Sequence, residues 1–435
     1  MKMINQLKEA AKLPDLRQRM LFLVFGFFIF LVGRHVPLSQ VDRAALERMF
    51  GGADNLFGVL NMFSGGALKQ FSVFALGVMP YINASIMLQL LTVALPQLKK
   101  LSQEGEHGRQ QIAAYTRWLT VALAIFQGMG LTSLLRSGKA LEISTLSQVQ
   151  IVLTVTAGTM FLLWLGEQMT EKGIGNGVSL IIFIGIMAAL PLEVGQTAKL
   201  LQSGAIGFFN VVLLFALLVA TVMGIIVIQQ GERQIRVQYA RRVVGTRMMG
   251  GASTFLPMKV NQAGVMPIIF AISVALFPRT IVTFIPLQTD WWARVRTFVD
   301  NYLTPNTGAG ARMWFSLGCY FLLVVAFTYF YTAVTYDTND VADNLKKWGG
   351  QIKGIRAGSE TARYIDRVLT RITFAGALFL GVLALLPYLV PLITKVSTFG
   401  LVGGTSLLIV IGVAMETMQQ IEAHLLMRHY KGFIG

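Results

Sequence analysis

The chain has 435 residues, of which 54% are hydrophobic and only 13% are charged. This composition excludes an ordinary soluble domain, in which charged residues make up about a quarter of the chain. The formal net charge of +16 arises from 37 Lys and Arg against 21 Asp and Glu, and it indicates an acidic partner or an anionic membrane surface.

Ten stretches contain no Asp, Glu, Lys or Arg, although an even spread of the charged residues would place about 26 of them there. Charge-free segments of this length are typical of transmembrane helices, so we predict an all-α integral membrane protein with ten of them. The shortest, at 20–33, 178–192 and 263–278, fall below the roughly 17 residues that a span requires, and we expect them to extend into flanking residues. The ten stretches are 20–33, 71–95, 118–135, 150–166, 178–192, 207–229, 263–278, 313–334, 372–394 and 396–415.

Lys and Arg are divided unequally between alternate connections. The side that holds both termini receives 25 of them, and the other side receives 12. Because positive charge is retained on the cytoplasmic side, we predict a multi-pass protein of the cytoplasmic membrane, with both termini in the cytoplasm.

Two long basic loops lie on that same side. The loops at 230–262 and 336–371 together hold 13 of the 37 Lys and Arg. Loops of this length are uncommon and usually functional, so they favour docking of a large acidic partner, with a topology signal as the alternative.

The sequence contains no recognisable catalytic motif. It contains no His-Glu-x-x-His, no intramembrane aspartate pair and no Walker A loop, so we expect neither catalysis, nor a cofactor, nor a metal. The alternative is a solute transporter, for which only Glu167 and Glu416 stand close enough to a span to bind a coupling ion. The single cysteine, Cys319, is interpreted as an apolar packing residue.

An internal repeat predicts two halves. Gly-Val-Met-Pro occurs at 77–80 in the second span and again at 264–267 in the seventh. Units of five spans are inverted relative to each other, and we expect one half at 1–195 and the other at 196–435. Proline bends transmembrane helices, so both segments are predicted to be bent, mobile elements beside a central path.

An apolar segment at 56–68 precedes the second span and is too short to cross a bilayer. Its Ser-Gly-Gly at 64–66 supplies a hinge. Two interpretations stay open at this point: a re-entrant helix that closes a cavity, or a surface helix that rests among the headgroups.

Several long motifs resemble the SecY family, the pore subunits of bacterial protein-translocation channels, and the resemblance covers almost the whole chain. Two segments depart from the family pattern: 34–42 lacks the usual Pro-Gly, and 353–358 lacks the usual flanking prolines. The motifs are Asn-Met-Phe-Ser-Gly-Gly-Ala-Leu at 61–68, Ala-Leu-Gly-Val-Met-Pro-Tyr-Ile-Asn-Ala-Ser at 75–85, Trp-Leu-Gly-Glu-Gln-Met-Thr-Glu-Lys-Gly-Ile-Gly-Asn-Gly at 164–177, Leu-Pro-Met-Lys-Val-Asn-Gln-Ala-Gly-Val-Met-Pro at 256–267, Asp-Asn-Leu-Lys-Lys at 343–347, Thr-Ala-Arg-Tyr-Ile-Asp-Arg-Val at 361–368 and Gly-Gly-Thr-Ser-Leu-Leu-Ile at 403–409.

The resemblance implies a passive protein-conducting channel with an aliphatic ring at its waist, a plug helix and a lateral gate between the second and seventh spans. The ring is expected at Val78, Ile82, Val178, Ile182, Ile269 and Ile409. The plug is expected at 57–66, with Phe57, Leu60, Asn61, Met62, Phe63, Ser64, Gly65 and Gly66. The gate contacts are expected at Asn83, Gln89 and Phe277.

The resemblance also implies partners. Arg241, Arg242, Arg247 and Arg356 are expected to dock the ribosome or the SecA motor, because an arginine fork binds phosphate or carboxylate with two hydrogen bonds. The other implied partners are SecE, SecG, SecDF, YidC, membrane lipids, and the unfolded preprotein with its signal sequence.

Overall fold

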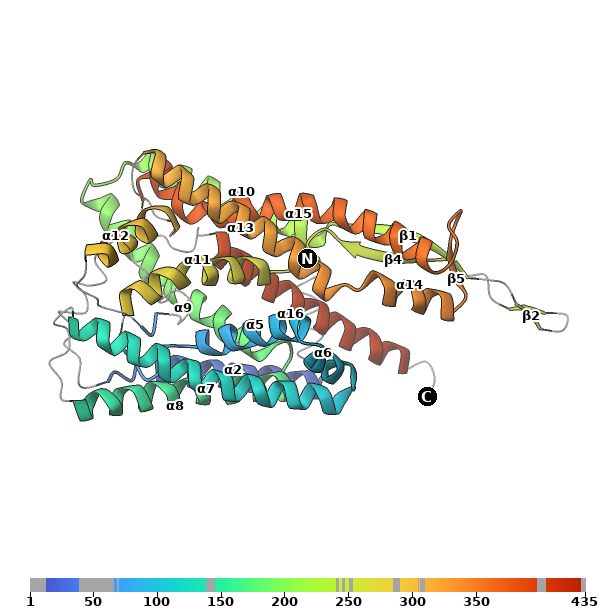
Figure 1. The fold of residues 1–435 in the computed structure, drawn as a ribbon, viewed down its shortest axis with the longest axis horizontal. Coiled ribbons are helices and arrows are strands. Elements are labelled where there is room, and N and C mark those ends of the chain that lie inside the picture. The colour runs from blue at the N-terminus through green and yellow to red at the C-terminus, as the bar shows by residue number, and fades with distance from the viewer. Residues whose placement is uncertain are drawn as a thin grey trace.

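The computed structural model describes residues 13–38, 66–68, 70–137, 145–239, 242–244, 247–249, 253–284, 290–303, 305, 310–396 and 404–431. Most of these residues are helical, and Figure 1 shows the helices running side by side along the long axis of the molecule. The helices are α2 (Pro14–Arg34), α5 (Met79–Ala94), α6 (Pro96–Gln103), α7 (Glu106–Ser137), α8 (Thr145–Lys172), α9 (Gly177–Gln202), α10 (Phe208–Gln230), α11 (Met266–Phe284), α12 (Asp290–Phe298), α13 (Ala311–Thr335), α14 (Thr338–Lys347), α15 (Ser359–Thr394) and α16 (Gly404–Lys431), with a short π-helix at Val299–Leu303.

Each of the ten charge-free stretches corresponds to one long helix, so the predicted ten-helix architecture is confirmed. Within the described residues, seven helices are long and apolar enough to cross a membrane, and the bent pair α5–α6 makes an eighth. The helices α7 and α11 occupy the remaining two stretches. The short stretches do recruit flanking residues, since α2, α9 and α11 have 21, 26 and 19 residues.

The repeated tetrapeptide has the same local structure in both halves. Gly77 and Gly264 have φ of 56° and 66°, and α5 and α11 both begin at the methionine that follows two residues later. Each proline is therefore the second residue of its helix, where the missing N–H is not needed, and the prediction that it bends the helix is wrong. The two helices run in opposite directions in Figure 1, because α5 leads toward α6 while α11 leads away from β4 toward α12.

Helix α9 is longer than the charge-free stretch that predicted it. It passes through residue 195 and ends at Gln202, and a turn follows at 203–207. The division of the chain into halves at 195–196 stays a prediction. The charged residues Glu193 and Lys199 end the apolar stretch, but polar residues continue a helix beyond a membrane span as readily as apolar ones. The charge pattern therefore marked the end of the span and not the end of the helix.

The two basic loops fold together. The strand β1 (Glu232–Tyr239) pairs antiparallel with β4 (Ser253–Lys259), from Glu232 opposite Lys259 to Gln238 opposite Ser253. The other edge of β1 pairs with β5 (Gly350–Ile352) of the second loop, which gives the sheet order β4-β1-β5. A hairpin of β2 (Arg242–Val244) and β3 (Arg247–Met249) extends from this sheet.

We call this body, together with α14, the basic projection. It lies at the same end of the molecule as the last turns of α16 (Figure 1). Its small core consists of Ile235, Val237, Met258 and Ile352, packed on Ile365 and Leu369 of α15. Since α15 begins at Ser359, the last part of the expected second loop, 359–371, is helix.

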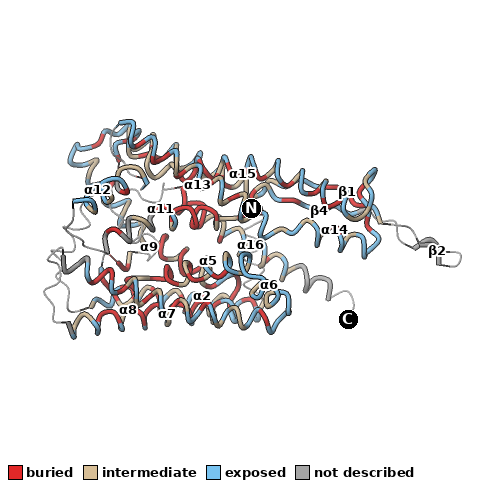
Figure 2. Tube along the Cα trace, viewed as in Figure 1, coloured by how far each residue is buried: buried red, intermediate tan, exposed pale blue. Residues whose placement is uncertain are grey.

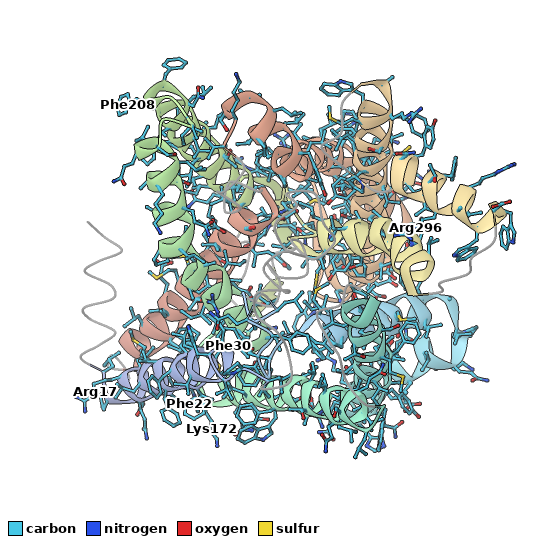
Figure 3. All side chains as sticks on the ribbon, turned by 90° about the vertical axis from the view of Figure 1, so that its left-hand side faces the viewer. Arg17, Phe22, Phe30, Lys172, Phe208 and Arg296 are labelled. Atoms are coloured by element: carbon cyan, nitrogen blue, oxygen red, sulfur yellow. The ribbon has the colours of Figure 1, made fainter. Side chains whose placement is uncertain are left out.

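Buried residues gather where α5, α9, α11 and α16 face one another, and the outward sides of the helices are exposed (Figure 2). These outward sides are apolar: Phe208 is 73% exposed at the rim, while Phe30 on the inner side of α2 is 2% exposed (Figure 3). Exposed apolar surface of this extent fits hydrocarbon and not water.

The close approach of α8 to α9 at Gly177 can be tested by substitution. A Cβ on Gly177 would overlap the carbonyl oxygen of Gly166 and lie 2.8 Å from the Cβ of Met169, so Gly177→Ala is expected to cost about 1–3 kcal/mol. Gly195, in the same helix, has nothing within 4 Å of such a Cβ. Gly195→Ala is expected to be neutral or stabilising by up to about 1 kcal/mol. Thermal unfolding of both purified variants in detergent compares them, and equal midpoints would contradict the close α8–α9 approach.

Candidate functional site

A cavity of about 840 Å³, which we call the funnel, includes Lys259 of β4 in its lining and so lies beside the basic projection. Residues of α5, α9, α10, α11 and α16, and of the turn before α11, line it, so both halves contribute to the wall. One group of lining residues is polar and contains only two charged side chains. It includes Ser85, Gln89, Asn176, Gln229, Gln262, Gln420, Lys259 and Glu416.

Five of the six expected ring residues line this cavity: Ile82, Val178, Ile182, Ile269 and Ile409. The four isoleucines are 3–7% exposed and belong to a single core cluster that includes residues of both halves. Val78 does not line the cavity. It is the N-cap of α5, is 2% exposed, and its carbonyl accepts the first helical hydrogen bond, from the N–H of Ile82 at 3.0 Å.

Polar and aliphatic side chains thus line one cavity, and the isoleucines in its lining are almost completely buried. Aliphatic side chains offer no fixed ligand to an ion, and a narrow apolar passage excludes water. The geometry suits a passage that is sealed at rest and has no preference for one solute.

Among the expected gate residues, Asn83 makes a contact between the halves. The hydroxyl of Ser273 on α11 donates to Oδ1 of Asn83 on α5 at 3.4 Å, between residues 190 positions apart. Gln89 does not reach α11: its Nε2 donates to Ser85 Oγ, one turn away in the same helix, and its side chain lines the funnel. Phe277 lies on α11, and its side chain is outside the described part of the structure.

The expected plug residues Phe57, Leu60, Asn61, Met62, Phe63, Ser64 and Gly65 lie outside the described residues. Gly66 has φ of +83° and begins a turn whose Ala67 and Leu68 are 0% and 2% exposed. An added Cβ on Gly66 would lie 2.5 Å from the guanidinium of Arg34, at the end of α2. The segment that leads out of the expected plug is therefore packed tightly against the first membrane helix.

Three of the four expected docking arginines belong to the described residues. Arg242 and Arg247 are on strands β2 and β3, opposite Met249 and Val244, and Arg241 lies outside the described residues. Arg356 is exposed in the turn before α15, and its carbonyl oxygen accepts from the Thr361 hydroxyl at 2.8 Å. The backbone at Arg356 is thus fixed while its side chain is available.

Glu167 and Glu416, the residues that could bind a coupling ion in a solute transporter, have different environments. Glu167 forms an ion pair with Arg117 on α7 at 2.9 Å and does not line the funnel, which gives it a role in helix pairing. Glu416 lines the polar wall of the funnel, above the ring. Within the described residues, no group of three His, Cys, Asp or Glu could hold a metal.

Sequence reasoning missed two residues that join the halves. Ser273 is the partner of Asn83, and Gln420 on α16 accepts a hydrogen bond from the backbone N–H of Gly175 at 2.7 Å. Neither residue belongs to a recognisable local motif, because each contact joins segments far apart in the chain.

Two helical halves around a polar funnel that narrows to an aliphatic ring define a multi-pass membrane channel. A family model described as SecY matches residues 72–418. The chain is 42% identical to the "Protein translocase subunit SecY" of Streptomyces coelicolor, over 99% of this chain and all of that one. It is 43% identical to the subunit of the same name from Thermotoga maritima, over 98% and 97% of the two chains. The chain belongs to the SecY family.

Solved structures agree at the level of the fold. "The structure of a protein conducting channel" matches with a TM-score of 0.67 at 15% identity, over 94% of this chain and 92% of that one. "Sec61 in the Canine ribosome-channel complex from the endoplasmic reticulum" matches with a TM-score of 0.65 at 15% identity, over the same shares. With the family, the predictions of a protein-conducting channel subunit and of a chain that is not an enzyme are confirmed.

Cysteine labelling tests the funnel and its floor. Glu416 and Ile409 are seven residues apart on α16 and lie on one face, but Ile409 is 3% exposed. In a Cys319→Ala background, Glu416→Cys is expected to react with a charged maleimide, and Ile409→Cys is expected to resist it. Leu322→Cys, on the outward side of α13, serves as the lipid-facing control. Equal labelling at 409 and 416 would show that water passes the ring at rest.

Proposed function

We propose that the chain conducts unfolded polypeptides through the funnel and the ring, and that it releases apolar segments laterally between α5 and α11. The observation that carries this proposal is one cavity, lined by both halves, whose lining includes the buried residues Ile82, Ile182, Ile269 and Ile409. A ring of flexible aliphatic side chains deforms around any sequence, whereas fixed polar ligands would select one solute.

The lateral gate is proposed at the Asn83–Ser273 contact. This hydrogen bond is long, at 3.4 Å, and both residues are only partly buried, so little free energy opposes its exchange for contacts with a signal helix. The signal sequence would supply the differential affinity that shifts the channel to its open state.

The plug is proposed at 57–66, on the side of the ring away from the funnel. The buried turn at 66–68, which leads from it toward α5, supports this position. The fold also matches, with a TM-score of 0.64 at 16% identity, a solved structure described as "The plug domain of the SecY protein stablizes the closed state of the translocation channel and maintains a membrane seal". This match supports the same role for the segment here.

The basic projection is proposed to dock the ribosome and SecA in the cytoplasm, with Arg241, Arg242, Arg247 and Arg356 as contacts. Two proteins of the same fold are described as ribosome-bound, the canine Sec61 channel and the "idle yeast Ssh1 complex bound to the yeast 80S ribosome". The excess of Lys and Arg on this side supports cytoplasmic termini in the cell inner membrane. SecE, SecG, SecDF and YidC are proposed as further partners from family membership alone.

A crosslink tests the path of the polypeptide. In the Cys319→Ala background, a cysteine at Ile82 is expected to form a disulfide with a stalled secretory chain that carries its own cysteine, and only when the signal sequence is functional. Leu322→Cys is the matched control, because that position is 66% exposed on the outward side of α13. A properly targeted chain that reacts at neither position would overturn the proposed path.

The gate contact gives a second test. Ser273→Ala removes the donor to Asn83, so we expect export of a protein with a weakened signal sequence to rise about threefold at most, the factor that an interhelical hydrogen bond of about 0.6 kcal/mol contributes. The control is Thr92→Val on α5, whose hydroxyl bonds only the Leu88 carbonyl of its own helix. Equal export in both variants would remove the Asn83–Ser273 bond from the gate.

A further inference from the structure

The turn between α8 and α9, residues 173–176, is held from two sides. Nη1 of Arg19 on α2 donates to the carbonyl of Gly173 at 3.1 Å. On the other side, the N–H of Gly175 donates to Oε1 of Gln420 at 2.7 Å, across 245 residues and between the two halves. Gly175 is buried and has φ of +91°, a conformation that favours glycine.

Helix α16 packs closely on this turn. A Cβ on Gly175 would lie 3.1 Å from Oγ1 of Thr417, which stands one turn before Gln420 on α16. The Thr417 hydroxyl donates to the carbonyl of Val413 in its own helix, and the acceptor for the N–H of Gly175 is Oε1 of Gln420. Removing Gln420 would therefore take this acceptor away from a buried backbone N–H, which is costly.

The contact is aligned with the aliphatic ring. Val178 follows Gly175 by three residues, at the start of α9, and Gln420 follows Ile409 by about three helical turns on the same face of α16. The hydrogen bond thus fixes the ring residues of α9 relative to the ring residue of α16. We call this contact the α9–α16 seam.

The opposite side of the ring is held less firmly. There, Ser273 meets Asn83 at 3.4 Å, through two partly buried side chains. At the α9–α16 seam, the bond is 0.7 Å shorter and its donor is a buried backbone group. Shorter and more buried hydrogen bonds resist opening more strongly.

We propose that Gln420 is a positioning residue that makes the α9–α16 seam the fixed side of the ring, so that the ring opens by movement of α5 and α11. The proposal rests on the proposed function of the ring as the seal. It assigns Gln420 no contact with the substrate: its role is to hold Val178 and Ile182 against Ile409.

Three variants isolate this role. Gln420→Ala removes the acceptor, while Gln420→Glu keeps a side-chain oxygen that accepts from Gly175. Gln419→Ala changes the preceding glutamine, which in the described structure makes no hydrogen bond to the turn. In planar bilayers, we expect the resting ion conductance of Gln420→Ala to rise about fivefold, the factor that one hydrogen bond contributes to an equilibrium. The Gln420→Glu and Gln419→Ala variants should match the wild type.

Hydrogen exchange provides a readout that does not depend on transport. The Gly175 amide should exchange faster in Gln420→Ala and at the wild-type rate in the other two variants. Wild-type conductance in Gln420→Ala despite faster exchange, or equal leakage in Gln420→Ala and Gln420→Glu, would overturn the proposal. Crosslinking of a secretory chain at Ile82 is measured in the same variants. If this crosslink still forms and still depends on the signal sequence, the proposed channel function holds, and only the role of Gln420 is overturned.

Discussion

The structure depends on an aliphatic contact between two bundles of helices that otherwise face lipid. Ile82, Ile182, Ile269 and Ile409 come from four helices and both halves, and they are almost completely buried in one hydrophobic cluster. Apolar association inside a membrane gains little from the hydrophobic effect, because lipid tails are equally apolar. The contact therefore gains its stability mainly from close packing, which a passing chain can replace with packing of its own.

This constraint explains why polar contacts between the halves are few and specific. Within the described residues, the funnel wall is rich in carboxamides and hydroxyls, yet only certain ones reach across to the other half. Each interhelical hydrogen bond in a membrane is worth about 0.6 kcal/mol on average. A small number of such hydrogen bonds, distributed unequally around the ring residues, can therefore determine on which side the two halves separate more easily.

The sequence predicted the helices well, because an absence of charge over a membrane-length segment has a single physical cause. It predicted less where tertiary structure intervenes. The repeated prolines begin helices instead of bending them, since a glycine with positive φ precedes each one and stops the chain from being helical earlier. The charge-free span 178–192 is shorter than α9, which ends at Gln202, because a charge ends a span without ending a helix. The pairing of β1 with β5, and the contacts made by Ser273 and Gln420, join distant segments that no local pattern connects.

The three-stranded sheet of the basic projection has a mechanical consequence. Strand β1 begins two residues after α10 ends, β4 leads into α11, and β5 leads into α15, so the sheet ties three membrane helices of the C-terminal half to one rigid body. None of the sheet's strands belongs to the N-terminal half. A load applied to the projection is therefore borne by one half alone, and the reaction to that load appears as shear between the two halves. A partner that pushes on this body works against the contact between the two halves.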